Sequence, residues 1–351
     1  MTLSLCMIVK NEESVLDRAL SNAGVFADEI VIVDTGSTDG TKRVASRYTD
    51  KIFDFEWNDD FAAARNFAIA KSTGDYFIWL DADDIIPMPS ARAISGLFRS
   101  LPADADIVML PYILSDSVSF YRERIVRRTP DNLFVGRVHE AIELKGNVVK
   151  AKPAVYHAKP QGRSSGTRNL DIYKKMERDG ATFSPRETYY YARELYFNGE
   201  FEAAAARFER FIAMPDGFCV NKTDACLLLS RCYEKSGDKA RALGVLYDSF
   251  LYGLPIGEVC CEIALKYFND KKYEIAAYWF ERAAHAKPDI KSGAFVDADY
   301  YGFLPYVWLS VCYDKLGKYR KAYSYHCRAR KLKPDHPSVI VNQAYFEDLG
   351  F

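Results

Sequence analysis

The sequence lacks several features that mark common classes of protein. No apolar run approaches the ~18 residues of a membrane-spanning helix. The net charge is −1 at pH 7, so no excess of positive charge attracts nucleic acid. The N-terminus becomes polar at Lys10-Asn11-Glu12-Glu13, too early for the apolar core of a signal peptide. We therefore expect a cytoplasmic protein with no transmembrane segment and no nucleic-acid partner.

The cysteines and glycines also lack the patterns of familiar binding motifs. Of the eight cysteines, seven lie at Cys219 or beyond, and their spacings match no common zinc motif. We expect buried free thiols, as in a reducing compartment. The chain has neither the lysine-bearing loop of a P-loop protein nor a G-x-G-x-x-G, which argues against both of those nucleotide-binding folds.

The first half of the chain alternates apolar strands with helices. Its 351 residues are enough for two domains, and 49% hydrophobic content is typical of a globular protein. The alternation predicts a doubly wound, mainly parallel sheet, in which ligands bind beyond the carboxyl ends of the strands. The expected strands are 3–9, 29–33, 52–55, 76–80, 106–112, 120–128 and 155–159, and the expected helices are 14–23, 41–48, 61–71 and 91–101.

Three carboxylates follow one of these strands within four residues, in Trp79-Leu80-Asp81-Ala82-Asp83-Asp84. Carboxylates this close repel one another, and a divalent cation or a proton relieves the repulsion. Hard cations accept such oxygen ligands and keep open positions for phosphate oxygens. The alternative is a solvated turn that caps the next helix, because Asp is a good N-cap residue.

Four motifs at these strand ends carry a resemblance. They are Met7-Ile8-Val9-Lys10-Asn11-Glu12-Glu13, Val33-Asp34-Thr35-Gly36-Ser37-Thr38-Asp39-Gly40-Thr41, Asp59-Asp60-Phe61-Ala62-Ala63-Ala64-Arg65-Asn66 and Leu80-Asp81-Ala82-Asp83-Asp84. In order and spacing they resemble family 2 glycosyltransferases of the GT-A fold. The resemblance covers about residues 2–170 and implies transfer of a sugar from a nucleotide sugar.

The resemblance also implies roles for the residues of these motifs. The base and ribose of the nucleotide would be surrounded by Val9, Asn11, Glu12 and Asp34. Arg65 would approach the diphosphate from its helix, where the alternative is a surface ion pair with Asp59 or Asp60. Asp81 would face the ribose or sugar, and Asp83 would bind Mn²⁺ or Mg²⁺. Such a cation and an arginine stabilise the charge that develops on a departing nucleoside diphosphate.

A catalytic base is expected near His139-Glu140, two ionisable residues within the short apolar segment 134–142. Inverting transfer needs one group to take the proton of the acceptor. In transferases of this type a similar G-x-V-H-E segment lies near the acceptor. The resemblance therefore implies Glu140 as the base, with His139 as its neighbour or as a sugar-binding donor. The alternative is a satisfied pair at a strand edge.

A second basic and imidazole-bearing segment follows the last expected strand. The resemblance implies that His157 joins the metal or the diphosphate, and imidazole suits Mn²⁺. Lys159, Arg163 and Arg168 would then close over the diphosphate as a lid. The alternative is a linker between domains with solvated charges. The expected catalytic domain is 1–170, followed by a linker or lid at 171–185.

The second half repeats a helix–turn–helix unit. The turn and the start of the second helix recur at 199–204, 237–242, 271–276 and 317–322, each ending near a small residue. A larger side chain follows at Phe208, Leu246, Phe280 and His326. The period of roughly 34 residues resembles tetratricopeptide repeats, or TPRs, over about 186–336, with a capping helix near 338–348. The expected second domain is 186–351, an all-α solenoid, with a generic helical bundle as the alternative.

Together these features lead to one functional hypothesis. The expected enzyme is a metal-dependent, inverting glycosyltransferase that moves a hexose or N-acetylhexosamine from a UDP-sugar to Ser, Thr or Cys of a peptide or protein. This architecture resembles bacterial peptide glycosyltransferases that modify bacteriocin precursors, with the acceptor gripped by the repeats. Alternatives are a cell-surface glycan or lipid-linked acceptor, a nucleotide-binding scaffold without activity, and a homodimer formed through the repeats. A nucleotidyltransferase would need a Gly- and Arg/Lys-rich N-terminal loop, which is absent.

Overall fold

The structure is a computed structural model that describes residues 1–159, 166–289 and 296–351. The chain divides into two compact units, Met1–Thr182 and Phe183–Phe351. The first unit contains β1 (Leu3–Val9), α1 (Leu16–Leu20), η1 (Ala23–Val25), β2 (Glu29–Asp34), α2 (Thr41–Ala45), β3 (Ile52–Asp54), α3 (Phe61–Lys71), β4 (Tyr76–Leu80), β5 (Asp84–Ile85), α4 (Met88–Arg99), β6 (Ala105–Ile113), β7 (Val118–Arg127), β8 (Phe134–Val135), β9 (Ala141–Ile142), β10 (Asn147–Lys150), β11 (Val155–His157) and α5 (Arg168–Arg178).

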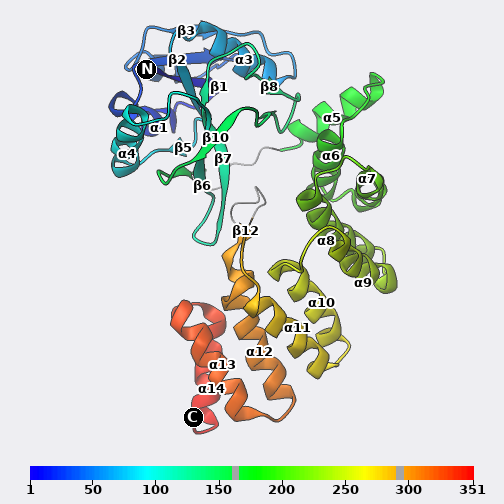
Figure 1. The fold of residues 1–351 in the computed structure, drawn as a ribbon. Coiled ribbons are helices and arrows are strands. Elements are labelled where there is room, and N and C mark those ends of the chain that lie inside the picture. Colours follow the sequence, from blue (N-terminus) through cyan, green and yellow to red (C-terminus); the bar gives the residue numbers. More distant parts are fainter. Residues whose placement is uncertain (160–165, 290–295) are drawn as a thin grey trace. The chain divides into compact units, whose positions relative to one another are not determined.

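The first unit is built on a mixed sheet with the order β3-β2-β1-β4-β7-β6-β11-β5, in which β10 also pairs with β6 (Figure 1). Strands β1 to β4 run parallel, as predicted. Strand β7 is antiparallel to both β4 and β6 because the short connection after Ile113 closes a hairpin. The α/β fold is confirmed, but the sheet is parallel only in part, because this hairpin reverses one strand.

Helices cover both faces of the sheet, and the side chains of the strands alternate between them. Along β4, Tyr76, Ile78 and Leu80 belong to the core under α1, α2 and α4. Phe77 and Trp79 point to the opposite core, under α3 and the β8–β9 hairpin. Because every residue of β4 is buried, this strand delivers Asp81 to the rim of the sheet from a fixed position.

The segment 171–185, which we predicted to be a linker or lid, is largely helical. Helix α5 begins at Arg168, and Leu170, Ile172, Tyr173 and Met176 are buried. Lys175 Nζ donates to Asp59 Oδ2 over 2.6 Å, and the hydroxyl of Tyr173 donates to the carbonyl of Val138 over 3.4 Å. The linker prediction was wrong because this apolar stripe packs on the first unit.

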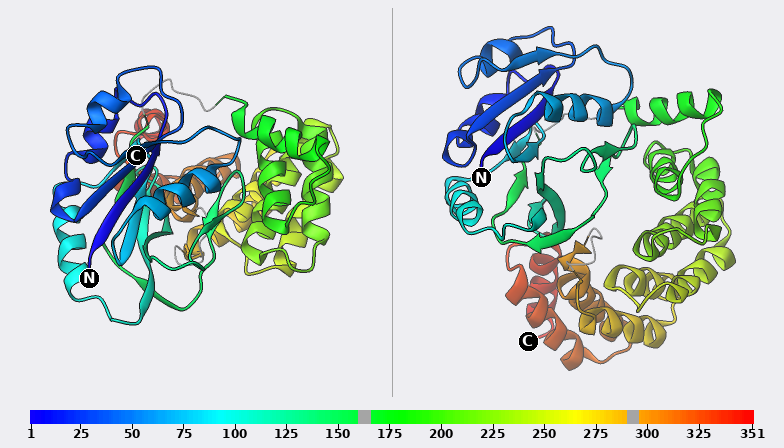
Figure 2. Two further views of the ribbon diagram at one scale, coloured as in Figure 1. Left: turned by 90° about the horizontal axis from the view of Figure 1, so that it is seen from above. Right: turned by 45° about the horizontal axis from the view of Figure 1, so that its top comes forward.

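The second unit is helical. It contains α6 (Pro185–Phe197), α7 (Phe201–Ala213), α8 (Cys219–Lys235), α9 (Lys239–Asp248), η2 (Ser249–Leu251), α10 (Gly257–Asn269), α11 (Tyr273–His285), β12 (Val296–Asp297), η3 (Ala298–Tyr301), α12 (Phe303–Lys315), α13 (Tyr319–Leu332) and α14 (Pro337–Asp348). Helices α6 to α13 form consecutive pairs that stack in chain order (Figure 2). The solenoid predicted from the repeats is confirmed.

The repeat positions found in the sequence have equivalent environments. The small residue of each turn motif is completely buried, at Ala204, Ala242, Ala276 and Ala322. The larger residues Phe208, Leu246, Phe280 and His326 are also completely buried. Each turn contains one residue with positive φ, namely Gly199, Gly237, Lys271 and Gly317. Glycine adopts this conformation without strain, so Lys271 is the exception in the series.

The structure can be compared with two expectations from the sequence, namely that no helix spans a membrane and that the cysteines are buried free thiols. Among the described residues, none of the helices has both the length and the apolarity needed to cross a bilayer. All eight cysteines are free, and six of them are buried. Burial raises the pKa of the Cys6 thiol to about 12, so this thiol is protonated and unreactive at neutral pH.

Candidate active site

A cleft of about 410 Å³ lies in the first unit beyond the ends of β1, β2 and β4. Several residues predicted to bind the nucleotide sugar line this cleft: Val9, Asn11, Glu12, Arg65, Asp81 and Arg168. Asp83, predicted as a metal ligand, also lines it. Lys159 of the predicted lid also lines it, whereas Arg163 lies outside the described residues. A volume of this size is within the range of small-ligand sites, about 300–1,000 Å³.

The ends of β1 and β2 are tied together by polar contacts. Asn11 Oδ1 accepts a hydrogen bond from the backbone of Thr38 over 2.8 Å, and the Asn11 backbone donates to Ser37 Oγ over 2.9 Å. Asp34 Oδ1 accepts from the backbone of Gly36 and Ser37 at 2.9 and 2.7 Å. Asp34 Oδ2 is buried and has no hydrogen-bond partner among the described residues. Asp34 therefore shapes the loop and keeps one acceptor unused.

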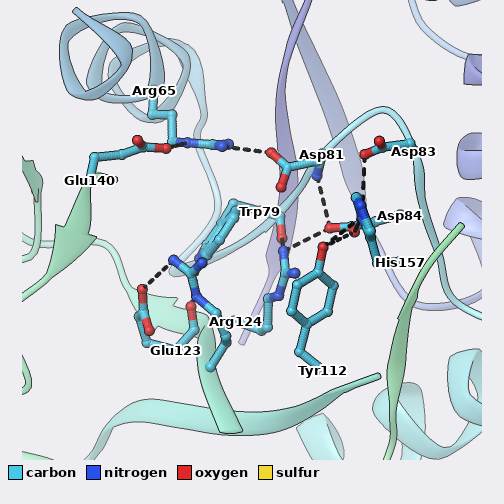
Figure 3. A network of polar contacts seen from close by, with 11 residues as sticks. Arg65, Trp79, Asp81, Asp83, Asp84, Tyr112, Glu123, Arg124, Glu140 and His157 are labelled. Atoms are coloured by element: carbon cyan, nitrogen blue, oxygen red, sulfur yellow. Dashed lines mark hydrogen bonds and ion pairs between the residues drawn. The ribbon is translucent and has the colours of Figure 1, made fainter. Parts of the chain in front are cut away.

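Arg65 bridges Glu140 and Asp81 in the charged network of Figure 3. Its Nε donates to Glu140 Oε1, and its Nη2 donates to Asp81 Oδ1, both over 2.6 Å. The guanidinium packs over the ring of Trp79 at 4.7 Å. Its Nη1 is buried and has no hydrogen-bond partner among the described residues. The alternative that Arg65 pairs with Asp59 or Asp60 is wrong, because Asp60 caps α3 and Asp59 pairs with Lys175.

The three acids of the 81–84 motif have different environments. Burial opposes ionisation of Asp81, but the charges of Arg65 and Arg124 outweigh it and lower the pKa of Asp81 to about 2. Burial raises the pKa of Asp83, and the negative charges of Asp81 and Asp84 add to this effect. Asp84 is completely buried and pairs with Arg124 at 3.0 Å. Asp83 is thus the acid of the three that would gain most from a cation.

His157 lies next to these acids on β11. Its Nδ1 is 3.6 Å from Asp83 Oδ1 and 3.6 Å from Asp84 Oδ1. The nearby carboxylates of Asp84 and Asp83 raise the pKa of His157 against the effect of burial. Ligand atoms of Asp83, Asp84 and His157 lie within 4.8 Å of one another. Carboxylate oxygen with one imidazole is a donor set that fits Mn²⁺ or Mg²⁺.

The two residues predicted for catalysis are placed differently. Glu140 is joined to Arg65, and 11% of its side chain is exposed. His139 has a positive φ of 52° and stacks on Tyr173 of α5 with ring centroids 6.5 Å apart. Neither residue is among those that line the cleft. Glu140 is connected to the cleft through Arg65, and His139 is connected to it through helix α5.

Other residues of the site were not identified from the sequence. Trp57, Phe61 and Thr35 line the cleft, and the Arg168 guanidinium lies 4.7 Å from the centre of the Phe61 ring. The completely buried Arg124 lies beneath the acids. The arginines in the expected strand 120–128 were a signal for buried ion pairs, since a buried strand rarely carries arginine without a partner.

Comparison with known proteins agrees with this geometry. Residues 4–151 match the family model of glycosyl transferase family 2. The first unit is a family 2 glycosyl transferase domain. This domain and the helical repeats were both predicted from the sequence.

Relatives of the chain combine these features in different ways. A TPR repeat-containing protein of Synechococcus elongatus is 36% identical over 141 residues, which cover 40% of this chain and 35% of that protein. The SPbeta prophage-derived glycosyltransferase SunS of Bacillus subtilis is 27% identical over 219 residues, covering 58% of this chain and 51% of SunS. The chain therefore spans roughly a third to a half of the length of these two relatives.

Two further similarities complete the comparison. The lipopolysaccharide core biosynthesis glycosyltransferase LpsC of Rhizobium meliloti is 27% identical over 207 residues, covering 54% of this chain and 75% of LpsC. Among solved structures, glucosyl-3-phosphoglycerate synthase from Mycobacterium tuberculosis, in complex with Mg²⁺ and uridine diphosphate, has a TM-score of 0.36 and 16% identity. That match covers 52% of this chain and 81% of the other.

Proposed function

We propose that this protein is a metal-dependent, inverting glycosyltransferase that moves a hexose or N-acetylhexosamine from a UDP-sugar to Ser, Thr or Cys of a peptide or protein. The observation that carries the proposal is the convergence of Arg65, Asp81 and Asp83 on one cleft at the rim of the sheet. Similarity to the glycosyltransferase SunS, over 58% of this chain, supports sugar transfer, and the helical repeats are the feature from which we expect a peptide or protein acceptor.

The nucleotide half of the donor has candidate partners at the ends of β1 and β2. Val9, Asn11 and Glu12 line this end of the cleft. Asp34 lies just behind it, with the buried Oδ2 as an unused acceptor. An acceptor in this position suits an N–H of a base or a ribose hydroxyl. Trp57 and Phe61 add aromatic surface on the opposite wall.

The diphosphate half faces positive charge and the cation site. Arg65 would stabilise the charge that develops when the bond between the sugar C1 and the diphosphate oxygen breaks. Arg168 and Lys159, both cleft residues, would add to this field. Asp83 and His157 would hold Mn²⁺ or Mg²⁺, which supplies charge neutralisation to the departing diphosphate. Asp81, fixed by Arg65, would accept hydrogen bonds from sugar or ribose hydroxyls.

The base is assigned to Glu140, with His139 as its neighbour or as a sugar-binding donor. Oxygen or sulfur of the acceptor attacks C1 of the sugar, and its proton passes to the carboxylate. Glu140 Oε1 is held by Arg65, and no hydrogen bond of Oε2 is found among the described residues. Arg65 would then couple the base to the leaving-group site, because it holds Glu140 and Asp81 together.

A glycan or lipid-linked acceptor is the second candidate. The similarity to LpsC favours it, since that protein is named for lipopolysaccharide core biosynthesis and the match covers 75% of its length. A nucleotide-binding scaffold without activity is disfavoured by the acids Asp81 and Asp83, which line the cleft beside Arg65. The buried, unsatisfied Arg65 Nη1 and Asp34 Oδ2 indicate that a ligand binds here. Unpaired buried polar atoms are costly unless a ligand satisfies them.

The test is a donor screen with the full chain. UDP- and GDP-sugars are incubated with Mn²⁺, Mg²⁺ or EDTA, and nucleoside diphosphate release is measured with and without candidate peptides. We expect release from a UDP-sugar that requires the metal and is accelerated by a Ser/Thr/Cys peptide. Acceleration by a glycan acceptor instead would favour the second candidate. No release from any donor would contradict the enzyme assignment.

Glu140→Gln tests the base separately. Glutamine keeps an oxygen for Arg65 Nε but does not accept the acceptor proton. We expect unchanged donor affinity and a ~10²–10⁴-fold slower transfer. Equal loss of donor affinity and transfer would instead show that Glu140 only positions Arg65.

A further inference from the structure

The carboxylates of the 81–84 motif are not equally available. Asp81 Oδ1 is taken by Arg65 at 2.6 Å. Both oxygens of Asp84 are occupied: Oδ1 accepts from the Tyr112 hydroxyl at 2.7 Å, and Oδ2 accepts from the Asp81 backbone at 3.0 Å. Asp84 Oδ2 is also 3.0 Å from Arg124 Nη1. Of these acids, Asp83 is the one that lines the cleft without such a partner among the described arginines.

Arg124 fixes the role of Asp84. Its side chain is completely buried between Trp79 and Tyr112, whose ring centres lie 4.0 and 4.4 Å from the guanidinium carbon. Nη1 also donates to the carbonyl of Trp79 over 3.1 Å. A guanidinium cannot lose its proton in a protein and needs a counter-charge when buried. Asp84 is that counter-charge, so it is a carboxylate that only accepts hydrogen bonds.

This conclusion determines the hydrogen bonds of Tyr112 (Figure 3). The tyrosine hydroxyl has one hydrogen, and Asp84 cannot donate, so the hydrogen points to Asp84 Oδ1. The tyrosine oxygen then accepts from His157 Nδ1, which is 2.9 Å away. The next polar atoms, Asp83 Oδ1 and Asp84 Oδ1, are each 3.6 Å from Nδ1, too far for a good hydrogen bond.

We propose that Tyr112 and the Arg124–Asp84 pair are positioning residues that hold the hydrogen of His157 on Nδ1 and so leave its Nε2 lone pair for a divalent cation. A second residue that receives the other ring N–H is what sets the tautomer of a metal-binding histidine. In this arrangement Asp84 anchors the site and Asp83 supplies the carboxylate ligand. The cation part of this assignment depends on the proposed function, whereas the tautomer does not.

The first experiment measures the tautomer in the metal-free wild-type protein by ¹⁵N-edited histidine NMR at pH 8.5. The sequence has five histidines, so the His157 signals can be assigned by their loss in His157→Gln. We expect the Nδ1–H form in the wild type and a mixture of tautomers in Tyr112→Phe. An Nε2–H majority in the wild type, or no change in Tyr112→Phe, would overturn the proposal. This result is independent of whether the chain transfers a sugar.

The second experiment measures Mn²⁺ affinity by titration calorimetry in the presence of UDP. Tyr112→Phe should weaken Mn²⁺ binding by about 10-fold, as loss of such an outer contact typically does. Tyr121→Phe is the matched control, because Tyr121 lies opposite Pro111 in the same hairpin and no hydrogen bond of its hydroxyl is found among the described residues. Equal affinities in both variants would contradict the positioning role. Failure of the wild type to bind Mn²⁺ would instead contradict the proposed function.

Discussion

The two units use charge in opposite ways. In the first unit, buried Arg65 and Arg124 converge on a single motif, and Arg65 lies on the cleft together with Asp81 and Asp83. In the second unit, ion pairs join neighbouring repeats: Arg193 of α6 contacts Asp224 of α8 at 2.6 Å, and Arg231 of α8 contacts Glu262 of α10. Concentrated charge at a cleft indicates a ligand site, whereas charge paired from helix to helix indicates stacking.

Aromatic residues show the same difference. In the first unit, the indole ring of Trp79 makes cation–π contacts with Arg65, Arg122 and Arg124, close to the acids. In the second unit, a tyrosine, a glutamate and a cation recur between repeats, as Tyr233, Glu209 and Arg241 and again as Tyr313, Glu281 and Lys321. The same cluster of tyrosine, glutamate and cation therefore occurs at two positions of the repeat array, where it joins neighbouring helices.

The sharpest test of this contrast replaces one acid in each unit. Asp83→Asn should reduce metal-dependent release of nucleoside diphosphate by about 10³-fold. Its stability should not fall, because the raised pKa of Asp83 means that its charge is disfavoured in the folded state. Asp224→Asn should leave the rate unchanged and lower the melting temperature. Similar activity in the two variants would remove the distinction between the units.

A second test compares buried with partly exposed arginines. Arg124→Met leaves Asp84 as an unpaired buried charge and should destabilise the protein by about 3–5 kcal/mol. Arg231→Met removes a pair that is 30% and 14% exposed and should cost about 2 kcal/mol. Urea denaturation followed by fluorescence measures both. The reverse order of the two losses would show that burial does not set the difference.

A third test uses pH within the second unit. Burial opposes ionisation of Glu281, but hydrogen bonds from Tyr313, Tyr325 and Lys321 outweigh it and lower its pKa. Its stabilisation is therefore present above the unfolded pKa of about 4.3 and is lost as the pH falls through the lower folded value.

At pH 7, Glu281→Gln should cost about 1 kcal/mol of unfolding free energy. The difference from the wild type should disappear towards pH 3, as measured by denaturation at several pH values. Glu274→Gln, an exposed change on the same helix, is the control and should show no such dependence. A constant difference at all pH values would mean that the glutamate contributes through packing alone.

The smallest expected effect concerns the turn that departs from the repeat. Lys271 has φ 60°, where the equivalent residues Gly199, Gly237 and Gly317 are glycines. Lys271→Gly should stabilise the protein by about 0.5–1 kcal/mol, because a side chain is strained in this conformation. Gly237→Ala should destabilise it by a similar amount, and thermal melting measures both. A destabilising Lys271→Gly would contradict the strain argument.

The sequence predicted those parts of the molecule whose signal is local. The strand 76–80 and the acids after it are contiguous, so their pattern is visible in a short window. The turn motifs of the second unit repeat, so each copy supports the others. The cleft residues Val9, Arg65, Asp81 and Asp83 were predicted because they belong to the motifs that resemble family 2 glycosyltransferases.

The parts that were missed depend on contacts distant in sequence. Arg124 reaches the carbonyl of Trp79 only because β7 lies beside β4. The periodicity of a sequence predicts strands but not the order in which they pair. Tyr112 was predicted only as part of the strand 106–112, because its hydroxyl meets His157 only through the pairing of β6 with β11. Most of helix α5 was predicted as a linker or lid because its sequence is mainly polar and contains only a short apolar stripe.

The identical burial of Ala204, Ala242, Ala276 and Ala322 has a consequence for how such a chain can evolve. If one helix pair were duplicated or deleted, the new junction would meet the same alanine contact as the old one, so the array could change length without redesign. The sheet has no such freedom, since β7 is inserted between β4 and β6 and removing it would separate them. The number of helix pairs after residue 183 can therefore change in evolution, while the first unit keeps its length and its sheet.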